Sequence, residues 1–190
     1  MPLNQTKLIK ICTMTKKYDI IWLDEVESTN KYVKKHIDSL DNLSVVSVLS
    51  QSAGRGQGDH KWHSQPGKNL LFSILLKQPD IPANRQSEIS DAAAYSIVKL
   101  LENHGIEAWV KPPNDIWVGK KKICGILIEH SLRSGRISWS IIGIGLNVNQ
   151  TVFPDDLPNP TSMALEKQGG DLNDILLEIM EIFSSSSLLK

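Results

Sequence analysis

The order of the apolar segments constrains the fold of this chain most strongly. Short runs rich in β-branched and other apolar residues predict strands at residues 20–23, 45–49, 70–76, 106–110, 123–129 and 137–146. Longer stretches with a helical period predict helices at residues 31–40, 87–104 and 172–183. Strands and helices do not alternate strictly. The pattern therefore predicts an α+β fold in which helices flank a mixed, mostly antiparallel sheet.

The composition places this fold in one domain. The chain has 190 residues, of which 41% are hydrophobic, and its 21 basic and 21 acidic side chains cancel. Such a balance argues against non-specific binding to nucleic acid or to anionic membranes, which requires a basic excess. No run approaches the ~20 apolar residues of a membrane span, and the start of the chain lacks the apolar block of a secretory signal. Cys12 and Cys124 are too far apart to suggest a disulfide scaffold or a zinc site, so we expect a cytoplasmic protein without a metal.

The ends of the predicted elements divide the chain into three regions. Residues 1–19 are expected to form an irregular lead, residues 20–183 the folded domain and residues 184–190 a frayed tail. The side chains of the run 28–30 are placed to cap the first helix, and Asp171 is placed to cap the last.

Residues 51–69 form a connection without a usable period, and loops this long in compact domains are often functional. Its glycines let the backbone approach a ligand, and Arg55 and Lys61 add charge suited to a carboxylate or phosphate. A flexible surface loop explains the composition equally well. The GxGxG spacing before a strand does not fit a dinucleotide-binding fingerprint, and Gly67-Lys68-Asn69 does not fit a P-loop.

Three further features are candidates for a site. Lys111 precedes two prolines, which would hold its charge at a fixed height above the sheet edge; the alternative is an ordinary surface lysine. Residues 141–147 form an apolar strand with alternate glycines, which make room for a flat ligand or for a tight helix–sheet contact. Asn147 at its exit is placed to read an amide or a purine edge. His60 and His63 are too loosely spaced with Asp59 to favour a metal site.

Four groups of residues, in this order, are more specific together than any one alone. They are Glu27-Ser28-Thr29-Asn30, Gln51-Ser52-Ala53-Gly54-Arg55-Gly56, Lys111-Pro112-Pro113-Asn114-Asp115 with Lys122-Ile123-Cys124-Gly125-Ile126-Leu127-Ile128-Glu129, and Gly143-Ile144-Gly145-Leu146-Asn147-Val148-Asn149. Together they resemble the biotin protein ligase (biotin–[acetyl-CoA-carboxylase] ligase) family. The resemblance implies the fold shared with lipoate ligases and, distantly, with class II aminoacyl-tRNA synthetases.

The resemblance also implies a reaction. Biotin would be activated with Mg²⁺–ATP to biotinyl-5′-AMP and then transferred to a lysine of a biotin carboxyl carrier protein domain. Two anions meet in the first step, so preplaced cations would lower its barrier. Many family members pair through sheet edges, which makes a homodimer a further expectation.

The matching residues acquire roles by the same resemblance. The expected catalytic cations are Lys111 and Arg55. The expected biotin site comprises Ser28, Thr29, Asn30, Gln51, Gly54, Arg55, Gly56, Gln57, Lys111 and Gly125. The expected ATP site comprises Arg55, Lys61, Trp62, Lys111 and Asn147, with Asn147 bonded to adenine and Lys61 and Trp62 at the closing end of the loop.

Departures from the family pattern carry their own expectations. Gln57 stands where many members have a second arginine, and His60 stands where members often have an arginine. Pro112 replaces the tryptophan that is common after the catalytic lysine. Fewer than 20 residues precede the first strand, so we expect no DNA-binding helix-turn-helix, and no SH3-like domain is expected after the last helix. The alternatives are a lipoate or octanoyl transferase of the same fold, or a non-catalytic binder of biotin or its adenylate.

Overall fold

The computed structural model describes residues 18–58 and 60–186. Most of the lead expected at residues 1–19, and residues 187–190 of the expected tail, lie outside this part of the chain. Within it, no helix combines the length and the apolar character needed to cross a membrane.

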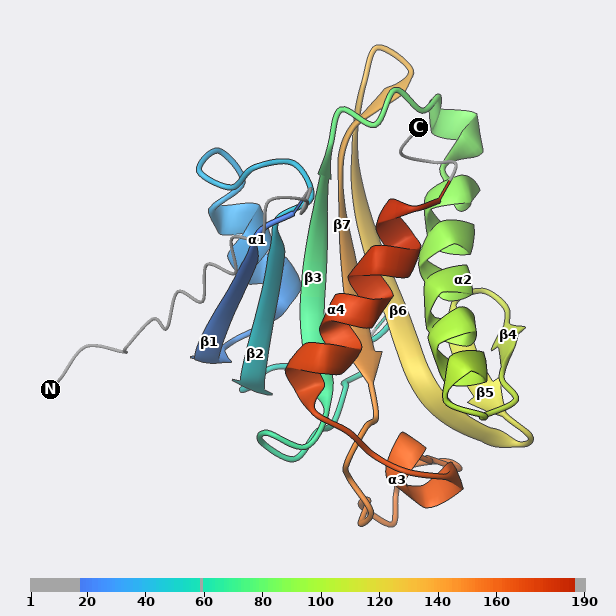
Figure 1. Ribbon diagram of the computed structural model, residues 1–190. Coiled ribbons are helices and arrows are strands. Elements are labelled where there is room, and N and C mark those ends of the chain that lie inside the picture. The colour runs from blue at the N-terminus through green and yellow to red at the C-terminus, as the bar shows by residue number, and fades with distance from the viewer. Residues whose placement is uncertain (1–17, 59, 187–190) are drawn as a thin grey trace, which may run out of the picture.

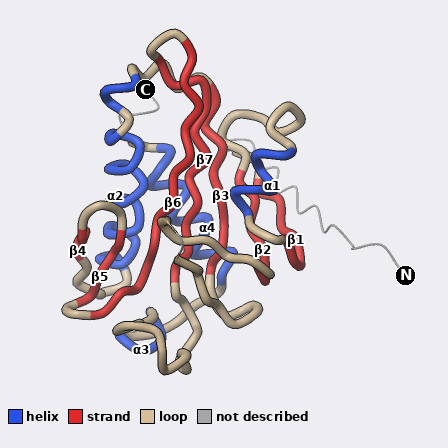
Figure 2. Tube along the Cα trace, turned by 180° about the vertical axis from the view of Figure 1, so that it is seen from behind, coloured by secondary structure: helices blue, strands red, loops and turns tan. Residues whose placement is uncertain are grey.

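A seven-stranded mixed sheet forms the centre of the protein (Figures 1 and 2). Its strands are β1 (Ile20–Val26), β2 (Val45–Gln51), β3 (Leu70–Lys77), β4 (Trp109–Lys111), β5 (Asp115–Val118), β6 (Lys121–Arg133) and β7 (Arg136–Leu146). They are arranged in the order β1-β2-β3-β7-β6-β5-β4, in which only β1 and β2 run parallel. The sheet confirms the predicted α+β class.

Helices cover both faces of the sheet. The long helices α2 (Ser87–Asn103) and α4 (Leu172–Ser184) lie side by side on one face, and α1 (Thr29–Lys35) lies on the other (Figures 1 and 2). Two short helices, η1 (Ala83–Arg85) and α3 (Met163–Glu166), complete the structure. Because both faces are covered, β3 is apolar along nearly its whole length rather than alternately apolar and polar.

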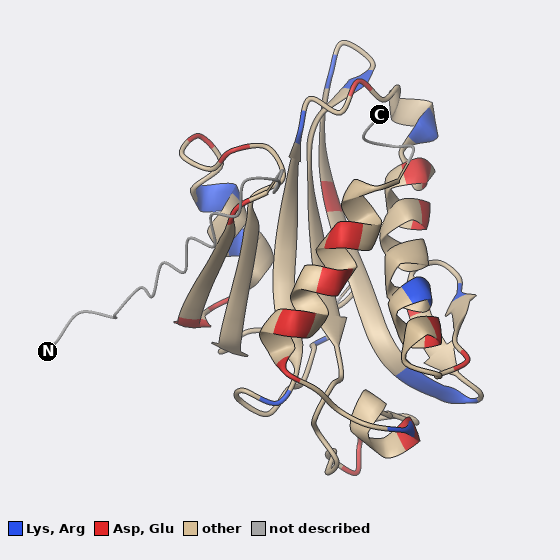
Figure 3. Cartoon of the chain, viewed as in Figure 1, with Lys and Arg blue, Asp and Glu red and all other residues tan. Residues whose placement is uncertain are grey.

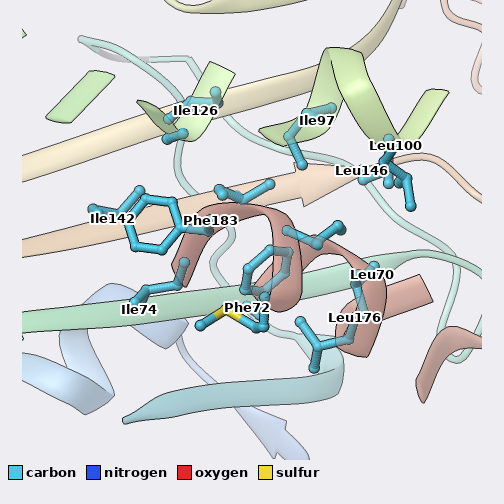
Figure 4. Close-up of a cluster of buried hydrophobic side chains, with 14 of the residues drawn as sticks. Leu70, Phe72, Ile74, Ile97, Leu100, Ile126, Ile142, Leu146, Leu176 and Phe183 are labelled. Carbon is cyan, nitrogen blue, oxygen red and sulfur yellow. The ribbon is translucent and has the colours of Figure 1, made fainter. Parts of the chain in front are cut away.

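The larger hydrophobic core lies between the sheet and the two long helices (Figure 4). Phe72 and Ile74 of β3 point into it and meet Leu176 and Phe183 of α4, all of them buried. The neighbouring positions on β3 point to the opposite face, where Leu75 joins a smaller cluster beneath α1. The alternation along one strand therefore supplies both cores.

Three predictions of local structure are corrected. The strand expected at residues 106–110 is shifted to β4, and β5 was not predicted; residues 112–114 form the turn between them, with a cis bond before Pro113. The first helix begins at Thr29 and ends at Lys35, earlier at both ends than expected. Its N-cap, Ser28, makes no side-chain capping bond, so the cap predicted from this run is not formed. Asp171 does cap α4, through the amides of Asn173 and Asp174.

Candidate functional site

A cavity of about 260 Å³ lies on the α1 face of the sheet, beneath the glycine-rich loop. It is lined by Ser28, Thr29, Asn30, Gln51, Arg55, Gly56, Gln57, His60, Lys61, Trp62, Asn114, Asp115, Lys122, Gly125, Ile126, Leu127, Gly143, Ile144 and Gly145. Nearly all of the residues predicted from the sequence for the biotin site therefore gather around one space. The polar wall comes from the start of α1 and the floor from β6 and β7.

The polar wall is a fixed network. Ser73 on β3 contacts the side chains of both Thr29 and Asn30 at 2.7 Å, and the Asn30 amide donates to the Leu127 carbonyl at 3.1 Å. The Thr29 backbone N–H donates to Gln51 Oε1 at 2.8 Å. The buried side chains of Thr29 and Asn30 are thus tied to β3 and β6, and the run lines the cavity. Such a wall suits a few specific polar contacts to a mostly apolar ligand.

Glycines make the floor flat. Gly125 on β6 and Gly145 on β7 are paired directly across the two strands. The indole of Trp62 lies against both, since a Cβ built on Gly145 would be 2.5 Å from Trp62 Cε2 and one on Gly125 would be 3.0 Å from Cζ3. A Cβ on Gly143 would meet Asn30 Oδ1 at 2.3 Å. The room predicted from the alternate glycines is thus used by a planar ring and an amide of the protein itself.

The described part of the glycine-rich loop is folded back as a short hairpin of residues 54–58 and 60–62, which we call the glycine hairpin. Arg55 and Lys61 form an antiparallel bridge, Gly56 N–H donates to the His60 carbonyl at 2.7 Å, and Trp62 N–H donates to the Gly54 carbonyl at 3.1 Å. Gly54 does not line the cavity; it is buried under the Trp62 carbonyl, which a Cβ would approach to 2.6 Å. Its role is to let the two sides of the hairpin meet.

A second cavity, of about 180 Å³, adjoins the first. The two share His60, Lys61, Trp62 and Lys122, and the second is completed by His63, Asn147, Phe153, Leu157, Pro158 and Pro160. Asn147 donates to the Thr161 carbonyl at 2.8 Å, while its buried Oδ1 accepts no hydrogen bond within the described part of the chain. A free amide oxygen beside apolar walls suits a flat heterocycle that offers an N–H donor.

The two lysines near the site differ in position. Lys111 lies outside the lining of both cavities; its ammonium sits 3.8 Å from the centre of the Trp117 ring. Lys122, which sequence reasoning missed as a site residue, lines both cavities and pairs with Asp115 at 2.7 Å. The signal was present in the sequence, because Lys122 opens the segment 122–129 on which the resemblance rests. Of the two lysines that line both cavities, Lys61 and Lys122, the one held by this ion pair is Lys122.

The base of the glycine-rich loop is held by a pair of buried amides. Asn69 Nδ2 donates to Gln150 Oε1 at 2.6 Å, and Asn69 Oδ1 accepts from the Val148 N–H at 3.0 Å. The loop and the segment after β7, which carry the walls of the second cavity, are thereby joined.

Among the described residues, no three His, Cys, Asp or Glu side chains gather closely enough to hold a metal ion.

Comparison with known proteins gives the same assignment from independent information. The model of the Biotin/lipoate A/B protein ligase family matches residues 22–147. The bifunctional ligase/repressor BirA of Bacillus subtilis is 35% identical over 82% of this chain and 48% of its own length. The biotin–[acetyl-CoA-carboxylase] ligase of Paracoccus denitrificans is 27% identical over 66% of this chain and 53% of its own. The chain thus spans about half the length of these curated relatives.

The structure is similar to that of the biotin protein ligase from Aquifex aeolicus in complex with biotin and ATP. The TM-score is 0.74 and the identity 30%, over 87% of this chain and 68% of the other. Residues 22–147, which the family model matches, include every residue that lines the first cavity. The chain belongs to the Biotin/lipoate A/B protein ligase family.

Proposed function

We propose that the protein is an ATP-dependent biotin–protein ligase. The observation that carries the proposal is the pair of adjoining cavities that share two lysines, Lys61 and Lys122, of which Lys122 is held by an ion pair with Asp115. A reaction that joins a carboxylate to a nucleotide phosphate needs two such spaces in contact. The names of two similar proteins, the biotin–[acetyl-CoA-carboxylase] ligase of Paracoccus denitrificans and the biotin protein ligase from Aquifex aeolicus, support biotin as the carboxylate.

The first cavity is the proposed biotin site. Its polar end, formed by Ser28, Thr29 and Asn30, suits the urea-like group of biotin, and the floor suits the apolar remainder. The second cavity is the proposed adenine site, where Asn147 Oδ1 would accept a hydrogen bond from the base. The carboxylate of biotin and the α-phosphate of ATP would then meet beside Lys122.

In the first step, a carboxylate oxygen of biotin attacks the α-phosphorus of ATP, taken as its magnesium complex. An oxygen–phosphorus bond forms, the bond to the bridging oxygen breaks, and pyrophosphate leaves. Both reactants are negatively charged, so Lys122 and Arg55 would lower the barrier by offsetting their repulsion. Trp62 and the glycine hairpin would limit the access of water to the mixed anhydride.

In the second step, the amine of a lysine on a biotin carboxyl carrier domain attacks the acyl carbon. An amide bond forms and AMP leaves. The exposed cavity mouth, at Arg55, Gln57 and Lys61, is the side from which that lysine would arrive.

The direct test is mass spectrometry of a carrier domain after incubation with the protein, biotin and Mg²⁺–ATP. We expect a gain of one biotinyl group on the carrier lysine, and lipoate in place of biotin should give no product. Biotin-dependent exchange of pyrophosphate into ATP measures the first step alone. A protein that binds biotin but supports neither reaction would contradict the proposal.

A further inference from the structure

Glu129, near the middle of β6, lines neither cavity but contacts residues that do. Its Oε1 accepts from Arg55 Nη1 at 3.2 Å and lies 3.5 Å from Asn30 Nδ2, while its Oε2 accepts from Lys34 Nζ at 3.1 Å. The three partners come from the glycine hairpin and from two positions on α1. One carboxylate therefore joins the sheet to both of the elements that enclose the first cavity.

The position of this carboxylate strengthens its contacts. The Glu129 side chain is 22% exposed, whereas Arg55 and Lys34 are 45% and 56% exposed. The charge of a partly buried carboxylate is less screened by water and salt than that of a fully exposed one. Both oxygens of Glu129 accept a hydrogen bond from a cation. The Asn30 amide is held mainly by the Leu127 carbonyl, at 3.1 Å, so the charged partners are the ones that depend on Glu129.

Described residues on both sides of the glycine hairpin contact the sheet. On the returning side, the Trp62 indole lies on Gly125 and Gly145. On the outgoing side, the side-chain attachment is the ion pair between Arg55 and Glu129. The antiparallel bridge between Arg55 and Lys61 joins the two sides, so a contact that holds one side also restrains the other.

We propose that Glu129 is a positioning residue that clamps the glycine hairpin over the cavity through Arg55. The clamp sets how often the hairpin opens, and it holds the Arg55 guanidinium at the cavity wall. Its effect on retention of an acyl-adenylate rests on the proposed function, whereas its effect on the hairpin does not.

The first test uses the protein without biotin or ATP and measures cleavage after Lys61 by endoproteinase Lys-C, read out by mass spectrometry. Glu129→Gln keeps the size of the side chain and its bond to Asn30 but removes the charge. Cleavage should become about two- to fivefold faster, the range for the loss of a partly exposed ion pair. Cleavage at lysines outside the hairpin serves as the internal control for folding.

Two further variants separate the clamp from a general effect of charge. Lys34→Met removes the other cation on the same carboxylate and should not speed cleavage after Lys61. In an Arg55→Ala background, Glu129→Gln should add nothing further, because its partner in the clamp is gone. Equal effects of Glu129→Gln with and without Arg55, an equal effect of Lys34→Met, or no effect of Glu129→Gln would each overturn the proposal.

The second test measures dissociation of preformed biotinyl-5′-AMP. Glu129→Gln should speed it about two- to fivefold, and Lys34→Met should leave it unchanged. If the wild-type protein forms no adenylate, the proposed function fails while the proteolysis result still decides the clamp. If the hairpin opens as expected but adenylate dissociation does not change, the role of Glu129 in retention is refuted.

Discussion

Lys111 and Lys122 show how much the surroundings of a residue decide its chemistry. Lys111 lies over the face of Trp117, which holds its charge at the sheet edge. Lys122 is paired with Asp115 and lies 5.6 Å from the centre of the Trp62 ring, between the two cavities. A cation can stabilise developing negative charge only where that charge arises.

Lys122→Ala should therefore lower biotin-dependent pyrophosphate exchange by at least ~100-fold, the usual cost of removing one electrostatic contact to a transition state. Lys111→Ala, the matched variant, should cost far less. The measurement is initial exchange rate for both variants, with thermal melting as the folding control. The opposite order of effects would support Lys111, the lysine predicted from the sequence, as the catalytic cation.

Gln57 lines the first cavity at its exposed mouth. Glutamine can donate a hydrogen bond to a phosphate but cannot neutralise its charge. Gln57→Arg should lengthen retention of preformed biotinyl-5′-AMP by up to ~10-fold, which corresponds to about 1.4 kcal/mol. An unchanged dissociation rate would mean that Lys61, or another cation, already fills this role.

The pairing of β6 with β7 builds the flat floor of the site from two glycines that face each other. Gly145→Ala places a methyl group 2.5 Å from the Trp62 indole, so the ring must move away. Biotin binding should weaken by about tenfold, equivalent to ~1.4 kcal/mol, when measured by titration calorimetry. Ile142→Val, on the same strand and buried in the larger core but outside the cavity lining, should leave binding nearly unchanged.

The contact between α2 and α4 includes a polar cluster near the end of α2. Asn103 and His104 both bond to Glu178 of α4 at 2.9 Å. Figure 3 shows that acidic residues recur along α4. Burial alone would raise the pKa of Glu178, but these hydrogen bonds and the nearby His104 charge outweigh it and hold the pKa below its ordinary value.

A carboxyl group whose pKa is lower in the folded state stabilises the fold above its unfolded pKa of about 4, and this contribution is lost as the pH falls through the folded value. Glu178→Gln should therefore flatten the acid side of the stability curve. Since the side chains of His104 and Glu178 are 36% and 32% exposed and therefore partly screened by water, the difference at neutral pH should be at most about 1 kcal/mol. Urea unfolding of both proteins between pH 7 and about pH 3 measures it; parallel curves would rule out this contribution.

At the scale of the whole molecule, one continuous core joins the sheet to α2 and α4. Phe183, close to the end of α4, is fully buried in this core with Phe72 of β3 (Figure 4). Phe183→Ala should lower the free energy of unfolding by about 3–5 kcal/mol, since it removes buried apolar area and leaves a cavity. Leu165→Ala, at a half-exposed position, should change it by less than about 1 kcal/mol. Comparable losses for the two variants in urea unfolding would contradict this account of the core.

Much of this molecule could be predicted from the sequence because strand and helix periods are local properties of the chain. The alternation and apolar runs at β3 and β7, and the helical period of α2 and α4, each predicted an element that the structure contains. The strand β5 was missed because four residues after a proline turn carry too little pattern, and β4 was misplaced for the same reason. The glycine-rich loop marked the site by its length, whereas the run 28–30 consists of the usual N-cap residues and was assigned to the site only through the family resemblance.

The sequence alone therefore determined the fold class, the family and most of the cavity lining. Tertiary structure decided which of two lysines lies between the cavities, that Trp62 covers Gly125 and Gly145, and that Glu129 meets Arg55. The physical reason is distance along the chain. Period and propensity act over a few neighbouring residues, whereas Arg55 meets Glu129, 74 positions away, only after β6 and the glycine hairpin have taken their places on the sheet.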